Sequence, residues 1–343
     1  CTTVSAPVDW ADPESDRVEL AVVRQESTNT TRGSVLTNPG GPGGSGFDFV
    51  SFGYAVSPAV RADFDVIGWD PRGVGRSTRV TCFTDNADTD AVLYGPVGDL
   101  DAEGARFATA CADNTGELLQ HMDTASSARD MDLIRALVGS DKLNYVGYSY
   151  GTFLGTVYTQ LFPGNLGAIV LDGAYDPALS LFDLFQDQSV AYDDAFRSYL
   201  EGCLRDPGCL FTGSVDDAAE QARVLIASAD TTALVADDGR VLDSPTLASA
   251  VVYSLFSTQY WDGLSALLRG VGDGDPTLAF AAADSANGRY GDGSYGLNYT
   301  EVYTSVMCVD WSSAGESIDD RLASIDAAAP IVGAPYARVD FAR

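Results

Sequence analysis

The sequence predicts an α/β protein in which a mostly parallel sheet is flanked by helices. In the first half of the chain, short segments rich in valine, isoleucine, leucine and aromatic residues alternate with helix-compatible segments, and glycine, proline or aspartate bounds them. Strands that alternate with helices in this way pair in parallel and are covered on both faces. The predicted strands span residues 18–23, 33–38, 64–69, 143–148 and 166–172.

A helix is predicted between the third and fourth of these strands, over residues 125–139. Thr124 or Ser126 can cap its start, and Gly139 can end it. Its apolar residues recur at helical spacing and form one stripe, which consists of Ala128, Met131, Ile134, Leu137 and Val138. The stripe supports the prediction of helices that cover the sheet.

The character of the sequence changes after about residue 177. From there to about residue 307 it is rich in alanine, aspartate, leucine and serine and is predicted to be mainly helical, with a hairpin at 236–241 and loops at 272–276 and 288–296. We interpret this part as an insertion or second domain. The predicted division is an α/β core over 1–177, a helical insertion over 178–307, and the start of a return to the core over 308–343.

The composition is strongly acidic. Of 343 residues, 49 are acidic and 20 are basic, which gives a formal net charge of −29 and a pI near 4.1. Such a surface repels polyphosphate, so we expect neither nucleic acid nor an anionic membrane surface as a partner. No apolar run is long enough to span a bilayer.

The six cysteines predict disulfide bonds rather than a metal site. They form no CxxC pair, and the chain has a single histidine, so we expect no zinc-type cluster and no cofactor. Cys203 and Cys209 are close enough in sequence to bridge within one loop, and Cys82 with Cys111 can close another. Disulfides indicate an oxidising compartment.

The pentapeptide GYSYG at residues 147–151 matches G-x-S-x-G, the nucleophile elbow. It follows a predicted strand and precedes an apolar, helix-compatible segment. Such a tight strand-to-helix turn exposes the serine hydroxyl at a helix N-terminus, whose dipole favours developing negative charge. A chance match in a glycine-rich chain is the alternative. We predict that Ser149 is a nucleophile.

The segment NPGGPGGSG at residues 38–46 follows another predicted strand. A glycine-rich loop can also bind phosphate, but no GK[ST] and no G-x-G-x-x-G with a later acidic residue is present. In hydrolases with a nucleophile elbow, such a loop supplies one N–H of the oxyanion hole and the residue after the nucleophile supplies the other. The predicted donors are therefore Gly41, with Gly40 as its neighbour, and Tyr150.

Four other charged residues lie at predicted strand ends. We expect Asp70 and Arg72 to hold their loop by hydrogen bonds to the backbone rather than to take part in catalysis. Asp172 and Asp176 are alternatives for a catalytic acid, although in hydrolases of this type that acid can also follow a later strand.

Taken together, four motifs resemble those of a known family. NPGGPGGSG, DPRGVGRS, GYSYGT and VLDGAYDP, in this order and spacing, are similar to segments of the secreted actinobacterial tripeptidyl aminopeptidases, which are α/β hydrolases of the proline-iminopeptidase branch of serine peptidases. The resemblance covers residues 1–177 and extends more loosely to Cys308. It implies an α/β-hydrolase fold with a largely helical cap domain over the active site, and an extracellular location.

The resemblance also implies an activity. It implies the release of short peptides, tripeptides in this family, from free N-termini, with Ser149 as the nucleophile and Gly41 and Tyr150 in the oxyanion hole. We therefore predict a secreted serine exopeptidase that forms an acyl-enzyme. The alternatives are an esterase or amidase of the same fold, or a catalytically incomplete hydrolase-like binding protein.

The sequence departs from the family pattern at the catalytic base. Hydrolases of this fold present the order Ser…Asp/Glu…His, whereas the single histidine, His121, precedes Ser149. The C-terminal strands that carry the triad Asp and His in the family have no counterpart here. A second chain with both residues, a truncated polypeptide, an inactive relative, or His121 as the base would each account for the difference. A shortened sheet would also expose an apolar edge.

A free peptide N-terminus is cationic, and carboxylates at the start of the helical insertion are candidates to bind it. Asp183, Asp187 and Asp194 are the predicted substrate-binding residues, and Asp193 and Glu201 are further candidates. The alternative is that these carboxylates form the solvated face of a helix in an acidic protein.

Overall fold

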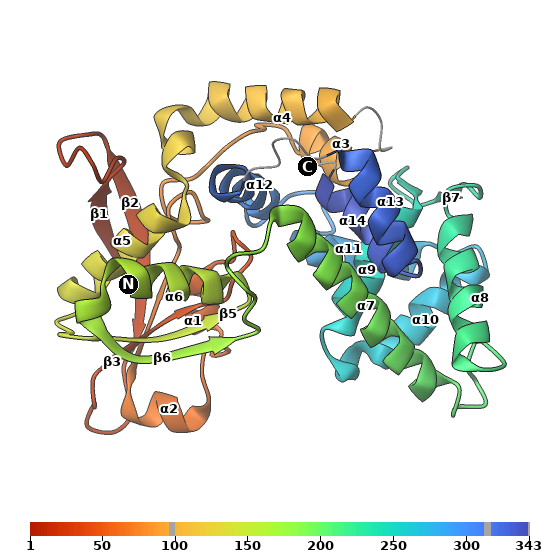
Figure 1. The fold of residues 1–343 in the computed structure, drawn as a ribbon, viewed down its shortest axis with the longest axis horizontal. Helices are drawn as coiled ribbons and strands as arrows, with labels where there is room; N and C mark the ends of the chain where they lie inside the picture. The colour runs from red at the N-terminus through yellow and green to blue at the C-terminus, as the bar shows by residue number, and fades with distance from the viewer. Residues whose placement is uncertain (96–99, 312–316, 342–343) are drawn as a thin grey trace. The chain divides into compact units, whose positions relative to one another are not determined.

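The computed structural model describes residues 1–95, 100–311 and 317–341 (Figure 1). The chain forms two compact units, and each is described by itself. Unit 1 comprises Cys1–Phe83, Ala108–Ala178 and Leu297–Ser312, and unit 2 comprises Thr84–Phe107, Leu179–Gly296 and Ser313–Arg343. Unit 2 thus includes two segments, 84–107 and 313–343, that lie outside the predicted insertion of residues 178–307. Unit 1 includes the segment 297–312, part of which was predicted to belong to that insertion.

Unit 1 contains a mostly parallel sheet, as predicted (Figure 1). The strands lie in the order β1-β2-β4-β3-β5-β6; β1 and β2 are antiparallel to their neighbours, and β4, β3, β5 and β6 are parallel. The strands are β1 (Thr2–Pro7), β2 (Arg17–Gln25), β3 (Ser34–Asn38), β4 (Asp65–Trp69), β5 (Leu143–Tyr148) and β6 (Leu166–Asp172). All the predicted strands are present, and β1 is an addition.

Helices cover the sheet because its central strands are apolar on both faces. Every residue of β3 and β4 is buried. Val35 and Val66 pack in one cluster with Val50 of α1 (Gly46–Ser51), so the pleat turns the buried Leu36 and Ile67 to the opposite face. The helix expected over 125–139 is α5 (Thr124–Leu137), capped by the Asp123 side chain, and it packs against α6 (Tyr150–Leu161). The short α2 (Pro58–Asp63) precedes β4.

The strand β6 forms one edge of the described sheet. It pairs with β5 on one side, and no strand in the described part of the chain pairs with its other side. Most of its residues are exposed, including Val170, whose exposed fraction is 54%. An exposed edge of this kind can pair with a further strand.

In its described residues unit 2 is helical, with a small hairpin formed by β7 (Leu234–Val235) and β8 (Val241–Leu242), as predicted. The helix α9 is almost wholly buried, and α8, α10, α11 and α14 pack around it. Its helices are α3 (Asn86–Tyr94), α7 (Leu181–Cys203), α8 (Val215–Ser228), α9 (Ser244–Leu255), α10 (Trp261–Gly272), α11 (Thr277–Asn287), α13 (Ile318–Ala328) and α14 (Gly333–Phe341). The helix α4 (Leu100–Thr115) contributes residues to both units.

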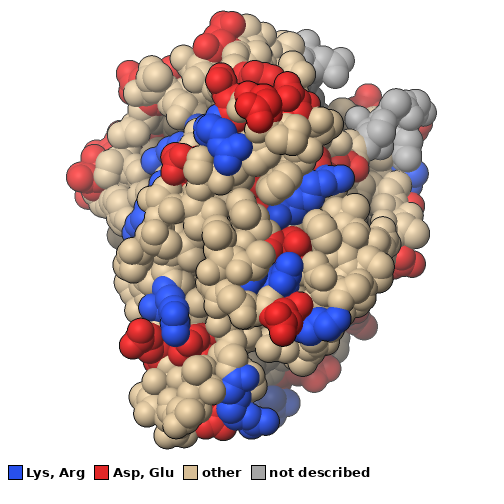
Figure 2. Space-filling view, turned by 90° about the vertical axis from the view of Figure 1, so that its left-hand side faces the viewer, with Lys and Arg blue, Asp and Glu red and all other residues tan. Residues whose placement is uncertain are grey.

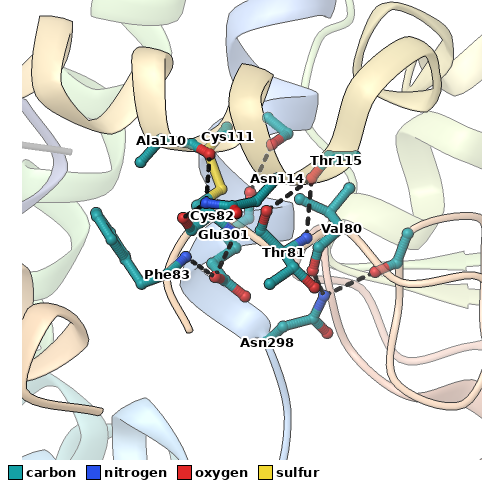
Figure 3. Close-up of a disulfide and its surroundings, with 12 residues drawn as sticks. Val80, Thr81, Cys82, Phe83, Ala110, Cys111, Asn114, Thr115, Asn298 and Glu301 are labelled. Carbon is teal, nitrogen blue, oxygen red and sulfur yellow. Dashed lines mark hydrogen bonds between the residues drawn. A yellow bond between two sulfur atoms is a disulfide. The ribbon is translucent and has the colours of Figure 1, made fainter. Parts of the chain in front are cut away.

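Both expected disulfides are present. Cys82 bonds Cys111 in unit 1, and Cys203 bonds Cys209 in unit 2. Figure 3 shows the first bond beside α12 (Tyr299–Asp310), whose Glu301 side chain accepts hydrogen bonds from the backbone N–H groups of Cys82 and Phe83. The helix α12 is thereby fixed to the segment that follows β4.

Charges of both signs are mixed on the face shown in Figure 2, where basic side chains lie among acidic ones. Within the described residues, no helix is both long and apolar enough to cross a bilayer. The same residues contain no group of three or more His, Cys, Asp or Glu side chains suited to hold a metal ion.

Candidate active site

Ser149 lies in the turn between β5 and α6, where a nucleophile elbow is expected. Its backbone angles are φ 52° and ψ −125°, and it is the one non-glycine residue with a positive φ in the described ranges. Such a conformation costs on the order of 1–3 kcal/mol and is found where surrounding structure enforces it. The residue is exposed, and its side chain caps no N–H of α6. The hydroxyl is therefore not taken up in capping the helix.

The flanking glycines allow the turn to be this tight. A Cβ built on Gly147 would lie 2.3 Å from the carbonyl oxygen of Gly151, and one built on Gly151 would lie 2.8 Å from the carbonyl oxygen of Asn38. Both separations are too short for a real side chain. The glycines of the G-x-S-x-G motif are thus required by backbone packing between β3, β5 and α6.

The glycine-rich loop after β3 packs directly on the elbow. A Cβ on Gly40 would lie 2.9 Å from Cβ of Ser149 and 3.1 Å from the backbone nitrogen of Tyr150. The Asn38 side chain accepts the N–H of Gly40 at 2.8 Å and holds the loop there. The N–H of Tyr150 is the first in α6, so no helical carbonyl can accept it. The loop that carries Gly41 therefore lies beside Ser149, and so does the N–H of Tyr150.

The side chain of Tyr150 is connected through Thr124 to the carboxylate of Asp310, a residue that was not among the predicted site residues. The Tyr150 hydroxyl bonds the Thr124 hydroxyl, which in turn donates to Asp310 at the end of α12. The Thr124 N–H also donates to Asp310, at 3.0 Å to Oδ1. Burial raises the pKa of Asp310, although the bonds from Thr124 oppose the shift. A lone aspartate in the stretch MCVDW offers no motif by which to recognise it.

Trp311, the residue after Asp310, belongs to a cluster of three aromatic rings. Phe153 of α6 stacks on Tyr175 with a centroid separation of 5.9 Å and lies 4.8 Å from the ring of Trp311. Burial, together with the negative charge of Asp310, raises the pKa of Tyr175. These side chains are partly exposed, and all belong to unit 1.

The structure gives His121 and the two alternative acids other contacts. Nδ1 of His121 lies 4.0 Å from the Asp9 carboxylate, and its carbonyl accepts a hydrogen bond from Arg72. Asp172 accepts the Ser149 N–H through its backbone oxygen, and the Asp176 carboxylate accepts the N–H of Ala178. In the described part of the chain, no side chain forms a hydrogen bond to the hydroxyl of Ser149.

Asp70 is buried and organises the loop after β4. Its carboxylate accepts hydrogen bonds from the Ser45 hydroxyl at 2.5 Å and from the backbone N–H groups of Phe47 and Arg76. These contacts agree with the structural role expected from the sequence.

Arg72 is fully buried, and all its donors are satisfied. It makes a bidentate pair with Asp130, with both distances 2.8 Å, and donates to the carbonyls of Pro7, Val8 and His121. Burial raises the pKa of Asp130, and the Arg72 charge opposes this shift. Arg72 is therefore a structural tie between the N-terminal hairpin and α5.

The carboxylates predicted to bind substrate lie on α7 of unit 2. Asp183 is 3.4 Å from Arg321, while Asp187 and Asp194 are exposed. The further candidate Asp193 is instead buried and accepts the N–H groups of residues 331–333. A cavity of about 600 Å³ within unit 2 contains none of the predicted site residues.

Comparisons with known proteins give matches over most of the chain. The model of the alpha/beta hydrolase fold matches residues 33–287. The chain is 33% identical over 331 residues to serine protease Hip1 of Mycobacterium tuberculosis, covering 90% of this chain and 63% of that protein. It is 32% identical over 327 residues to tripeptidyl aminopeptidase of Streptomyces coelicolor, covering 90% of this chain and 60% of that protein.

A third relative is carboxylesterase B of Mycobacterium tuberculosis, which is 37% identical over 335 residues, covering 90% of this chain and 62% of that protein. The chain thus spans about three fifths of the length of these relatives. The resemblance drawn from the motifs is confirmed, and the chain belongs to the alpha/beta hydrolase fold family.

Proposed function

We propose that this protein is a serine peptidase that releases short peptides, tripeptides among them, from free N-termini. The observation that carries the proposal is the strained φ of 52° at Ser149, in a turn against which the Gly40 backbone packs. A strained, exposed serine at a helix N-terminus, beside a glycine-rich loop, is the geometry of acyl transfer. Two relatives are a serine protease and a tripeptidyl aminopeptidase.

In the proposed reaction, Ser149 Oγ attacks the scissile carbonyl and gives its proton to a base. The N–H groups of Gly41 and Tyr150 bind the oxyanion of the tetrahedral intermediate. The C–N bond then breaks, the leaving amine takes the proton, and an ester on Ser149 remains. Water hydrolyses this ester, which releases the short peptide and restores the hydroxyl.

We propose that the base and its orienting acid, a His and an Asp, are supplied by a polypeptide segment outside this sequence or by a second chain. The exposed edge of β6 supports this, because a further parallel strand can pair there. His121 is engaged near Asp9 and Arg72, away from any contact with Ser149 in the described residues.

The substrate and location are also proposals. Asp183, Asp187 and Asp194 would attract the cationic N-terminus of a peptide over a distance, since two of them are exposed without a basic partner in the described chain. The two disulfides suit an extracellular protein.

The test uses a fluorophosphonate probe and two variants, each prepared as the complete protein together with the segment or second chain that carries the base. The parent protein should be labelled covalently, Ser149→Ala should not be labelled, and Ser126→Ala should be labelled like the parent. The active preparation should cleave a tripeptide anilide with a free amine and spare its N-acetylated form. Absence of labelling in a folded, complete protein that includes the base would overturn the proposal and favour a binding protein.

An esterase is the second candidate, because one relative is a carboxylesterase. It would keep the same nucleophile and oxyanion hole. Rapid Ser149-dependent turnover of short acyl esters, without cleavage of any free-amine tripeptide, would favour this candidate.

A further inference from the structure

Asp310 places a negative charge near the elbow without a basic partner. Its carboxylate accepts hydrogen bonds from the N–H and hydroxyl of Thr124, and no Lys, Arg or His side chain in the described residues pairs with it. The one charged side chain that acts on Asp310 among the described residues is Asp123, which has the same sign. Asp310 also ends α12, where the helix dipole is negative. The two donors of Thr124, at the N-terminus of α5, offset part of the cost of keeping this carboxylate ionised, and a cation that reaches it would offset more.

The surrounding rings suit the same cation. Phe153, Tyr175 and Trp311 are partly exposed and lie within one ring-contact cluster beside Asp310. Aromatic faces attract ammonium groups through their quadrupole, most strongly where water is excluded. A carboxylate near aromatic rings suits an organic ammonium ion better than an anion.

We propose that Asp310 binds the free α-ammonium group of the peptide substrate, with Phe153, Tyr175 and Trp311 completing the site. This inference rests on the proposed function, because it assigns one end of the same substrate site. Thr124 connects Asp310 to Tyr150, whose N–H is proposed to bind the oxyanion. One connected set of residues thus holds both the amine and the reacting carbonyl. A fixed separation between the two would set the length of the released peptide.

The kinetic test compares a tripeptide anilide with its desamino analogue, which lacks only the N-terminal amine. Asp310→Asn keeps an oxygen for the Thr124 N–H but removes the charge. We expect kcat/KM for the free-amine substrate to fall about 10- to 100-fold, mainly through KM, and kcat/KM for the desamino analogue to stay within about threefold. Asp113→Asn, an exposed carboxylate of α4 in unit 1, removes the same charge and should change neither value.

Equal losses for both substrates, or no loss for either, would overturn the assignment and leave Asp310 as a residue that stabilises the start of α5. Trp311→Leu keeps the carboxylate and removes a ring face, so it should weaken the preference for the amine severalfold. It serves as a second variant if Asp310→Asn does not fold.

A binding measurement separates this inference from the proposed chemistry. In the Ser149→Ala background, calorimetry should show that a tripeptide amide binds more tightly than its desamino form, and that Asp310→Asn abolishes the difference. If the parent labels with fluorophosphonate but the two ligands bind alike, the ammonium site is wrong and the serine nucleophile stands. If the two ligands differ in affinity but no labelling occurs, the ammonium site stands and the serine nucleophile is wrong.

Discussion

Glu301 shows how one buried carboxylate can make stability depend on pH. Its side chain is 8% exposed, and Oε1 accepts the N–H groups of Cys82 and Phe83 at 2.7 and 3.0 Å (Figure 3). Burial raises the pKa of Glu301, although the two N–H groups oppose the shift. The protonated form is therefore favoured in the folded state relative to the unfolded chain. Its contribution to stability is present below the unfolded pKa and is lost as the pH rises through the folded pKa.

Glu301→Gln should remove this dependence. The amide oxygen can still accept both N–H groups, and no charge has to be buried. We expect the variant to be more stable than the parent at pH 7, by on the order of 1 kcal/mol, and equal to it near pH 4. Urea unfolding of both proteins at the two pH values measures the difference. A parent and variant that keep the same difference in unfolding free energy at both pH values would show that Glu301 is not the source.

At the residue scale, motif positions could be predicted, whereas roles that depend on tertiary contacts could not. Ser149 and Gly40 were visible because a strained turn and a close backbone approach demand particular residue types at particular spacings. The sequence pattern groups Asp193 with its exposed neighbours, whereas the structure buries it against residues 331–333. Its partners lie 138 to 140 positions away in the sequence, so no local pattern could reveal them.

At the scale of elements, the buried Asp193 side chain joins α7 to the start of α14. Its carboxylate accepts three N–H groups, at 2.8 to 2.9 Å, from residues at the N-terminus of that helix. Asp193→Ala leaves these buried donors without an acceptor and should lower the unfolding free energy of unit 2 by about 2–4 kcal/mol. Asp194→Ala is the matched control, since Asp194 is exposed on the same helix and should cost less than about 0.5 kcal/mol.

Thermal or urea unfolding followed by helical circular dichroism compares the two variants. Similar small losses in both would show that the contact between α7 and α14 contributes little to stability.

Among the elements, buried strands were predictable and β1 was not. β3, β4 and β5 are rich in valine, isoleucine, leucine and aromatic residues and lie between turn residues, which is typical of central strands. β1 has the sequence TTVSAP, and half of its residues are exposed. It is an antiparallel edge strand held by pairing with β2, and neither a continuous apolar run nor a strict alternation marks it. Edge strands depend on their neighbour more than on their own composition.

At the scale of the whole molecule, each unit has its own disulfide, so the two bonds can be tested separately. Cys82 and Cys111 are 29 residues apart in unit 1, and Cys203 and Cys209 are 6 residues apart in unit 2. A cross-link stabilises chiefly by restricting the unfolded chain, and this effect grows with the length of the closed loop. The first bond should therefore matter more.

Replacing Cys82 and Cys111 together by serine should lower the unfolding free energy of unit 1 by about 3.5 kcal/mol, and replacing Cys203 and Cys209 should lower that of unit 2 by about 2 kcal/mol. Urea unfolding of the two double variants and of the reduced parent measures both effects.

The first pair also borders Glu301, which fixes α12, the helix that ends at Asp310. Loss of that bond should therefore reduce the preference for a free amine as well, whereas loss of the bond in unit 2 should not. Equal effects on that preference from both pairs would contradict a role for α12 in holding the substrate amine.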